Sequence, residues 1–215
     1  MYRRMAKPLT DRRSFIAGGL STILLSGVPG SAVGACVQPQ FDPATLGFRH
    51  CFSVSGGNSR KWTWMAKRHA LQDEQYGLES RGCNWARMCR RTAGMSGYRA
   101  AVEINGLANA VPYLWEAGDV WRTPREFANG GGDCEDYAVA KYFLLRRAGW
   151  GDEQVGIFVY LPRFRPEVAH AVAVINDRKS VFSLDNLNKS ITEINAKHIE
   201  RPLFFVNESC YLGFI

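Results

Sequence analysis

The spacing of apolar residues changes from a helical period to a strand period near residue 150. Residues 61–75, 84–91 and 97–115 carry apolar side chains at helical spacing, which predicts three helices with core-facing stripes. His69, in the first of these, is predicted to be a half-buried helix residue rather than a ligand. Residues 119–127, which include Pro124, predict a turn-rich connection. Residues 155–161, 169–175 and 180–186 predict strands.

Residues 129–148 hold the strongest local signal in the chain. Three glycines, which predict a flexible approach, precede Asp133, whose carboxylate can accept hydrogen bonds from the first helical turn as an N-cap. Asp136 completes a near capping box, and alanines and leucines favour the helix until Gly149 ends it. Cys134 is therefore predicted to be the first residue of this helix.

This position gives Cys134 two chemical interpretations. The positive end of a helix dipole stabilises a thiolate, the nucleophilic form, and free amides of the first turn can bind an oxyanion. The carboxylates of Asp133, Glu135 and Asp136 act in the opposite direction unless a metal ion or an imidazolium offsets their charge. The alternative is a buried structural cysteine on an ordinary capped helix.

Residues 176–179 separate two predicted strands and indicate a hairpin. A turn centred on Asp177 and Arg178 places His170 directly opposite Asp185, on one face, with Cβ atoms about 5 Å apart. A slip of one residue would place the two side chains on opposite faces. A cysteine nucleophile requires an imidazole oriented by a carboxylate, so Cys134, His170 and Asp185 are a candidate triad. Each residue also has an ordinary interpretation when it is taken singly. His170 is then a strand histidine without a chemical role, and Asp185 is a turn residue at the end of a strand.

The first 35 residues are predicted to be an export signal. A basic segment is followed by residues 14–35, which hold no charge and several glycines, as in a secretory signal, and Arg12-Arg13-Ser14-Phe15-Ile16 resembles a twin-arginine signal. The weak hydrophobicity argues against a permanent transmembrane anchor. Cleavage after Ala35 leaves residues 36–215 as a single domain, whereas a lipoprotein-type interpretation makes Cys36 a lipidated N-terminus.

The charge of the chain comes mainly from this signal. The formal net charge is +7 over 215 residues, but residues 1–35 carry five basic residues against Asp11, so about +3 remains after their removal. No nucleic-acid partner is expected. The following cluster is interpreted as a solvated helix face: Arg81, Arg87, Arg90, Arg91 and Arg99.

Export to an oxidising compartment raises the question of disulfides. Four cysteines remain beside Cys36 and Cys134, namely Cys51, Cys83, Cys89 and Cys210. Cys83 and Cys89 can pair with each other or tie the termini through Cys51 and Cys210, and the sequence does not choose between these pairings. A zinc site that includes His50 is the other interpretation, but the spacings match no zinc motif.

Three motifs together resemble one protein family. Gly132-Asp133-Cys134-Glu135-Asp136-Tyr137-Ala138, followed by Ala140-Lys141-Tyr142, is similar to a motif of the bacterial transglutaminase-like cysteine proteinases of the LapG type. The upstream sequence Trp121-Arg122-Thr123-Pro124-Arg125-Glu126-Phe127 and the downstream sequence Leu184-Asp185-Asn186-Leu187 also resemble this family. The similarity covers roughly residues 85–210.

The resemblance implies a fold and a site. The fold is expected to be α+β, with the papain-like, transglutaminase-core arrangement in which N-terminal helices include a nucleophile helix packed on an antiparallel sheet. Cys134 is expected to be the nucleophile, His170 the general base and acid, and Asp185 the orienting carboxylate. Members of the family depend on Ca²⁺, which implies a metal site at Asp133 and Glu135, with Asp136 as a further candidate.

The resemblance also implies partners and a compartment. Members are periplasmic proteases that cut large surface adhesins near an N-terminal retention region, which disperses biofilm, and an inner-membrane receptor responsive to cyclic di-GMP holds them in check. Two alternatives are an amide transferase built on the same site and a catalytically idle, calcium-binding interaction module. The second oxyanion donor is unassigned, with Asn105 and Trp121 as candidates.

Overall fold

Apart from one short strand at residues 51–54, helices occupy the first half of the described chain and strands the second. The computed structural model describes residues 39–40, 42–48, 51–54, 59–77, 83–116, 118, 120–177 and 180–214. The helices are α2 (Arg60–Tyr76), α3 (Asn84–Thr92), α4 (Gly97–Asn109), α5 (Pro124–Gly130) and α6 (Cys134–Arg147), with the short 3₁₀ turns η2 (Pro43–Leu46), η4 (Asp152–Gln154) and η5 (Ala196–His198). The strands are β1 (Cys51–Val54), β2 (Val155–Pro162), β3 (His170–Asp177), β4 (Ser180–Leu184), β5 (Thr192–Glu193), β6 (Ile199–Val206) and β7 (Tyr211–Phe214).

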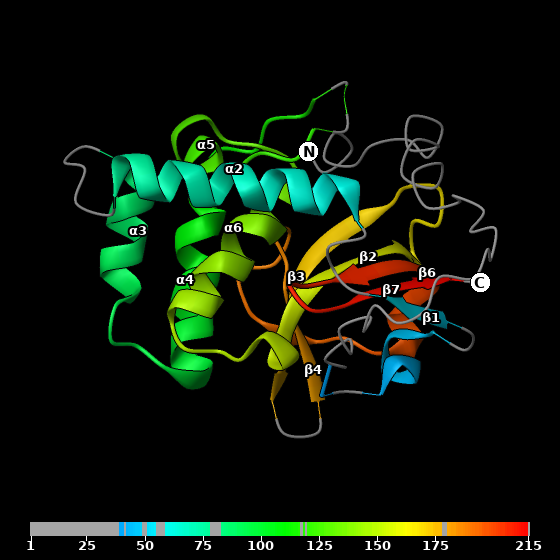
Figure 1. Cartoon of the computed structure of the whole chain (residues 1–215). Helices are drawn as coiled ribbons and strands as arrows, with labels where there is room; N and C mark the ends of the chain where they lie inside the picture. Colours follow the sequence, from blue (N-terminus) through cyan, green and yellow to red (C-terminus); the bar gives the residue numbers. More distant parts are fainter. Residues whose placement is uncertain are drawn as a thin grey trace, which may run out of the picture.

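The strands form one sheet in the order β1-β7-β6-β2-β3-β4-β5, with every neighbouring pair antiparallel. Helices α2 to α6 gather beside this sheet, and α6 packs directly on β3 and β2 (Figure 1). A large apolar cluster lies between helices and sheet, and a smaller one, which includes Leu46 and Phe158, lies separate from it. The expected α+β arrangement, with the nucleophile helix on an antiparallel sheet, is therefore confirmed.

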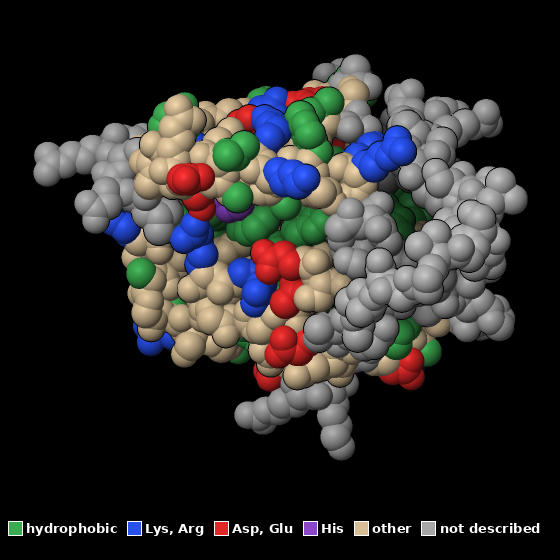
Figure 2. Space-filling model, viewed as in Figure 1, with side chains coloured by type: hydrophobic (Ala, Val, Ile, Leu, Met, Phe, Trp, Pro, Cys, Tyr) green, Lys and Arg blue, Asp and Glu red, His purple; other side chains and the backbone are tan. Residues whose placement is uncertain are grey.

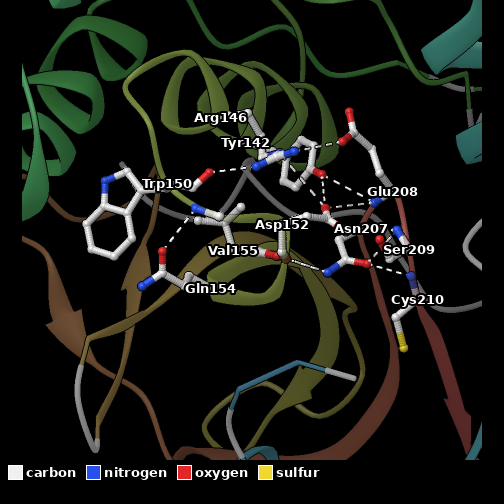
Figure 3. A network of polar contacts seen from close by, with 11 residues as sticks. Tyr142, Arg146, Trp150, Asp152, Gln154, Val155, Asn207, Glu208, Ser209 and Cys210 are labelled. Atoms are coloured by element: carbon white, nitrogen blue, oxygen red, sulfur yellow. Dashed lines mark hydrogen bonds and ion pairs between the residues drawn. The ribbon is translucent and has the colours of Figure 1, made fainter. Parts of the chain in front are cut away.

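Polar contacts fix the C-terminal end of α6 against the sheet (Figure 3). The Tyr142 hydroxyl donates to Asp152 Oδ1 at 2.6 Å, and the Ser209 backbone N–H donates to Asp152 Oδ2 at 2.9 Å. Arg146 pairs with Glu208 at 3.1 Å. Because Glu208 and Ser209 lie in the turn between β6 and β7, these bonds join the helix to the last two strands. They anchor the C-terminal end of α6, the helix that begins with Cys134.

Two helical predictions are corrected in the segment before α6. The helix predicted over residues 97–115 ends at Asn109, because Pro112 cannot continue it. The predicted core residues Leu114 and Trp115 are consequently 43 % and 50 % exposed. The connection predicted over residues 119–127 contains the start of α5, which has a capping box between Thr123 and Glu126 and a proline at its first turn.

The predicted hairpin between β3 and β4 forms, but its register differs by two residues. Asp177 pairs with Ser180 and Ala173 pairs with Leu184, so the turn lies one residue later than predicted. His170 is therefore not directly opposite Asp185, which lies one residue beyond the end of β4. A shift of two residues preserves the side-chain face, whereas a shift of one would reverse it.

Some predictions concern residues that lie outside the described part of the chain. These are the export signal at residues 1–35, the processing or lipidation site at Cys36, and His50. Within the described ranges, no helix combines the length and the apolar character that crossing a bilayer requires. Arg87, Arg90, Arg91 and Arg99 are exposed as expected, and basic and acidic side chains are interspersed over the described part of the face in Figure 2.

Candidate active site

The approach to Cys134 is tightly packed rather than flexible. Gly131 has a φ of 79°, and a Cβ there would lie 2.4 Å from the Pro112 carbonyl oxygen. A Cβ on Gly132 would lie 2.3 Å from a carboxylate oxygen of Asp136. The Gly132 carbonyl also accepts a hydrogen bond from the Leu114 backbone N–H at 2.8 Å. The glycines are required because the chain passes other backbone and the first turn of α6 at close range.

Cys134 is the first residue of α6 and is buried, as the sequence predicts. Asp136 accepts hydrogen bonds from the backbone N–H groups of Arg122 at 2.8 Å and Asp133 at 3.1 Å, which caps the helix. The thiol of Cys134 donates to Glu135 Oε2 at 3.2 Å. The nucleophile candidate therefore lies at the positive end of the helix and in direct contact with a carboxylate.

His170 and Asp185 meet although they are not directly cross-strand. His170 Nε2 lies 2.8 Å from Asp185 Oδ1, and both side chains are buried. A proton held at Nε2 by the carboxylate leaves Nδ1 with the lone pair that a general base needs. The predicted contact between His170 and Asp185 is thus present, although the two strands pair in a different register than predicted.

Asp185 is held by groups from several elements. Its Oδ1 accepts from the Leu187 backbone N–H at 2.9 Å, and the Asn109 side-chain amide donates to its backbone carbonyl at 3.0 Å. Burial alone would raise the pKa of Asp185, but His170, the Leu187 hydrogen bond and the charge of Lys141 together hold the pKa below its ordinary value. The carboxylate is thereby ionised at neutral pH and oriented toward the imidazole.

Three supporting residues escaped the sequence analysis. Tyr160 pairs with His170 across β2 and β3, and burial, followed by the charges of Asp185 and Cys134, raises the pKa of its phenol beyond the usual range. Tyr160 is therefore near both ends of the candidate triad. Asn109 and Lys141 were not recognised because both lie on helices far from Asp185 in sequence. Asn105, a candidate oxyanion donor, instead donates to the backbone carbonyls of residues 188 and 189.

The residues expected to hold calcium fit it in part. Asp133 and Glu135 are buried carboxylates with the hard oxygen atoms that Ca²⁺ prefers. Burial, followed by the charge of Glu135, raises the pKa of Asp136 to about 7. Both Asp136 oxygens already accept backbone hydrogen bonds, one from Arg122 and one from Asp133, so its role as a ligand stays a prediction. Within the described residues, no group of three or more His, Cys, Asp or Glu side chains is arranged to hold a metal ion.

The cysteine pair that the sequence left open does not form a disulfide. Cys83 is the N-cap of α3 and Cys89 lies six residues later, and both are thiols. Helical geometry separates two such positions by about 9 Å along the axis, whereas disulfides need Cα atoms within about 7 Å. Cys83 instead accepts a hydrogen bond from Arg125 at 2.9 Å.

A cysteine at a helix N-terminus and a histidine–aspartate pair on an adjoining antiparallel sheet together define the class of transglutaminase-like cysteine hydrolases. Sequence comparison makes this class specific. Residues 100–200 match the sequence model of the bacterial transglutaminase-like cysteine proteinases. This segment contains Cys134, His170 and Asp185, and its match to that family indicates cysteine protease activity.

Solved structures support the same fold. LapG from Legionella pneumophila superposes with a TM-score of 0.51 at 25 % identity, covering 66 % of this chain and 82 % of that one. EGTA-treated LapG matches with the same TM-score of 0.51 and 25 % identity, over 66 % of this chain and 81 % of that one. Calcium-bound LapG gives 0.52 at 23 % identity, over 66 % and 83 %. No curated protein sequence matches the chain.

Proposed function

We propose that the protein is an exported, calcium-dependent cysteine endopeptidase that uses Cys134, His170 and Asp185 as its triad. Its substrate is a large surface adhesin, cut near the N-terminal region that retains it. The observation that carries this proposal is the 2.8 Å contact between His170 Nε2 and Asp185 Oδ1, within the same family match that contains the helix-terminal Cys134. Residues 1–35 direct the chain to the periplasm, where its activity is regulated by an inner-membrane receptor responsive to cyclic di-GMP.

The reaction is an acyl transfer through a thioester. His170 takes the thiol proton at Nδ1, and the Cys134 sulfur attacks the carbonyl carbon of the scissile peptide bond. The backbone N–H of Cys134, at the first position of α6, stabilises the oxyanion. The amine leaves with the proton from His170, and water, activated by the same imidazole, hydrolyses the thioester. Asp185 keeps the imidazole in the required tautomer and stabilises its charged form.

Asp133 and Glu135 are the residues that would hold calcium. The bound ion supplies positive charge that offsets the carboxylates beside the nucleophile. Support comes from the buried carboxylates at the start of α6 and from the calcium-bound and EGTA-treated states in which LapG has been solved.

The test is the rate of Cys134 alkylation by iodoacetamide from about pH 5 to 9, resolved by peptide mass spectrometry. We expect a thiol pKa below its ordinary value of about 8.5 in the presence of calcium. It should rise in His170→Ala and after chelation. An ordinary thiol pKa under every condition would contradict the proposal and favour the idle, calcium-binding module.

A second measurement separates the protease from an amide transferase. The purified enzyme is incubated with an adhesin N-terminal fragment and an excess of a primary amine. We expect cleavage products with free carboxyl ends, because water resolves the thioester. Products whose carboxyl ends carry the amine would identify the transferase.

A further inference from the structure

Lys141 is a lysine in the interior of the protein. Its side chain lies on α6, seven residues after Cys134, and is fully buried with 0 % exposure. The Nζ donates to the backbone carbonyl of Leu184 at 3.0 Å, the residue immediately before Asp185. A buried ammonium is costly unless a polar group or a charge compensates it, so its presence at this point needs an explanation.

The charged group that compensates Lys141 is Asp185. Burial lowers the pKa of Lys141 to about 7, and the charge of Asp185 opposes that change. In return, the charge of Lys141 is one of the factors that keep the pKa of Asp185 low. The third neighbour is the Tyr137 ring, whose centroid lies 5.7 Å from Nζ and faces the ammonium from the same helix.

We propose that Lys141 is a positioning residue for the acid of the triad, an inference that rests on the proposed function. Its ammonium donates to the Leu184 carbonyl, which fixes the end of β4 and thereby the position of Asp185, the next residue. It also adds positive charge near Asp185, whose carboxylate contacts His170. Lys141 thereby links the helix that carries the nucleophile to the carboxylate that orients the base.

The neighbouring Asn109 shows why the charge matters. Its neutral amide donates to the Asp185 carbonyl at 3.0 Å, one residue after the carbonyl that Lys141 binds. A neutral donor is thus enough to hold backbone in this loop. The fold also has other attachments for α6, in the apolar cluster and in the contacts of Figure 3. What Lys141 adds beyond these is positive charge next to Asp185.

The experiment compares Lys141→Met with Lys67→Met, the same substitution on an exposed position of α2. Lys141→Met keeps the length of the side chain but removes the charge and the donor to the Leu184 carbonyl, so the folding of each variant is measured by circular dichroism before its activity is compared. We expect Lys141→Met to reduce kcat on the adhesin fragment by about 10- to 100-fold with little change in KM. The acid limb of the pH profile for Cys134 alkylation should move to higher pH, because the pKa of Asp185 rises. Lys67→Met should behave as wild type.

Lys141→Gln separates the hydrogen bond from the charge. It retains a donor for the Leu184 carbonyl but has no positive charge, so we expect part of kcat to return while the acid limb stays shifted. A folded Lys141→Met with wild-type kcat and pH profile would overturn the inference. Loss of folding in both variants would also overturn it, because the ammonium would then serve the fold.

Asp185→Asn, measured in parallel, shows which idea has failed. If Asp185→Asn is nearly inactive and Lys141→Met is normal, only the role of Lys141 is wrong. If Asp185→Asn is fully active, the proposed triad itself is wrong.

Discussion

Two histidine–aspartate pairs with a buried histidine occur in the part of the chain that the structure describes, one among the helices and one at the end of the sheet. In α2, His69 Nε2 lies 3.5 Å from Asp73 Oδ2, one helical turn away. At the sheet, His170 Nε2 lies 2.8 Å from Asp185 Oδ1. Each pair also has a buried cysteine in its neighbourhood, Cys89 and Cys134 respectively. The composition of the two clusters is therefore nearly the same.

Their charged neighbours make them chemically different. Asp73 is shared with two arginines, Arg147 and Arg125, the latter at 3.9 Å. Burial lowers the pKa of His69 to about 4; Asp73 opposes this change, and the two arginines add to it. Burial likewise raises the pKa of the Cys89 thiol to about 12. Histidine and cysteine are thus both held neutral among the helices.

The sheet pair has the opposite surroundings. Asp185 accepts from the neutral amide of Leu187 and lies near a single lysine, so its charge remains available to His170. Cys134 begins a helix, whereas Cys89 lies within one. A nearby histidine and aspartate are therefore not sufficient to make a cysteine site, because burial and the two arginines beside Asp73 leave His69 neutral.

The largest expected effect comes from removing one histidine or the other. We expect His170→Ala to lower kcat on the adhesin fragment by about 10⁴-fold, because the thiol loses its base. His69→Gln should retain turnover within about twofold. The measurement is steady-state cleavage at saturating calcium. Equal losses in both variants would remove the distinction between the two clusters.

Replacing the aspartates gives the next effect. Asp185→Asn should lower kcat by about 10²- to 10⁴-fold, because the wrong imidazole tautomer is favoured. Asp73→Asn should leave kcat nearly unchanged but reduce the free energy of unfolding by about 1–3 kcal/mol, since two arginines lose a partner. Cleavage assays and urea denaturation of each variant provide the two readouts. An inactive but stable Asp73→Asn would contradict this division.

A third expected effect concerns stability alone and is an acid-dependent loss that comes from His69. Its pKa is about 6.5 in the unfolded chain and about 4 in the folded protein. Between these values the unfolded chain binds a proton that the folded protein does not, so the free energy of unfolding falls as the pH decreases. The expected total is about 3 kcal/mol.

His69→Gln supplies the control for this prediction. The variant has no titrating group at this position, so its stability should depend less on pH over the same range. Urea denaturation of both proteins at about pH 7, 6, 5 and 4 gives the difference. Parallel curves for the two proteins would show that His69 is not the source.

Local patterns predicted the helix of Cys134 well and the hairpin less well. Its N-cap, its capping box and the positive φ of Gly149 after its end are all local features. The register of β3 and β4 was not decidable, because pairings two residues apart place the same apolar side chains on the same face. The α5 helix was missed although Thr123 and Glu126 carry a capping box, because Pro124 was interpreted as a turn residue rather than as a first helical residue.

Long-range contacts limited the rest. Lys141 reaches Leu184 and Asn109 reaches Asp185 across 43 and 76 residues, and no local pattern encodes such contacts. The glycines before Cys134 led to a prediction of flexibility, because the sequence does not show that Pro112 and Leu114 pack against Gly131. The sequence therefore identifies the candidate reacting groups, whereas the groups that hold them in place emerge only from the three-dimensional arrangement.

The sheet order makes the candidate site depend on segments that follow it in the sequence. Strand β6 (Ile199–Val206) lies between β2 and β7, so residues that come after Cys134, His170 and Asp185 complete the middle of the sheet. The turn after β6 donates backbone hydrogen bonds to Asp152, which also accepts from Tyr142 of α6. A truncation before residue 199 would therefore keep all three candidate residues but remove part of the framework that supports their helix and strands.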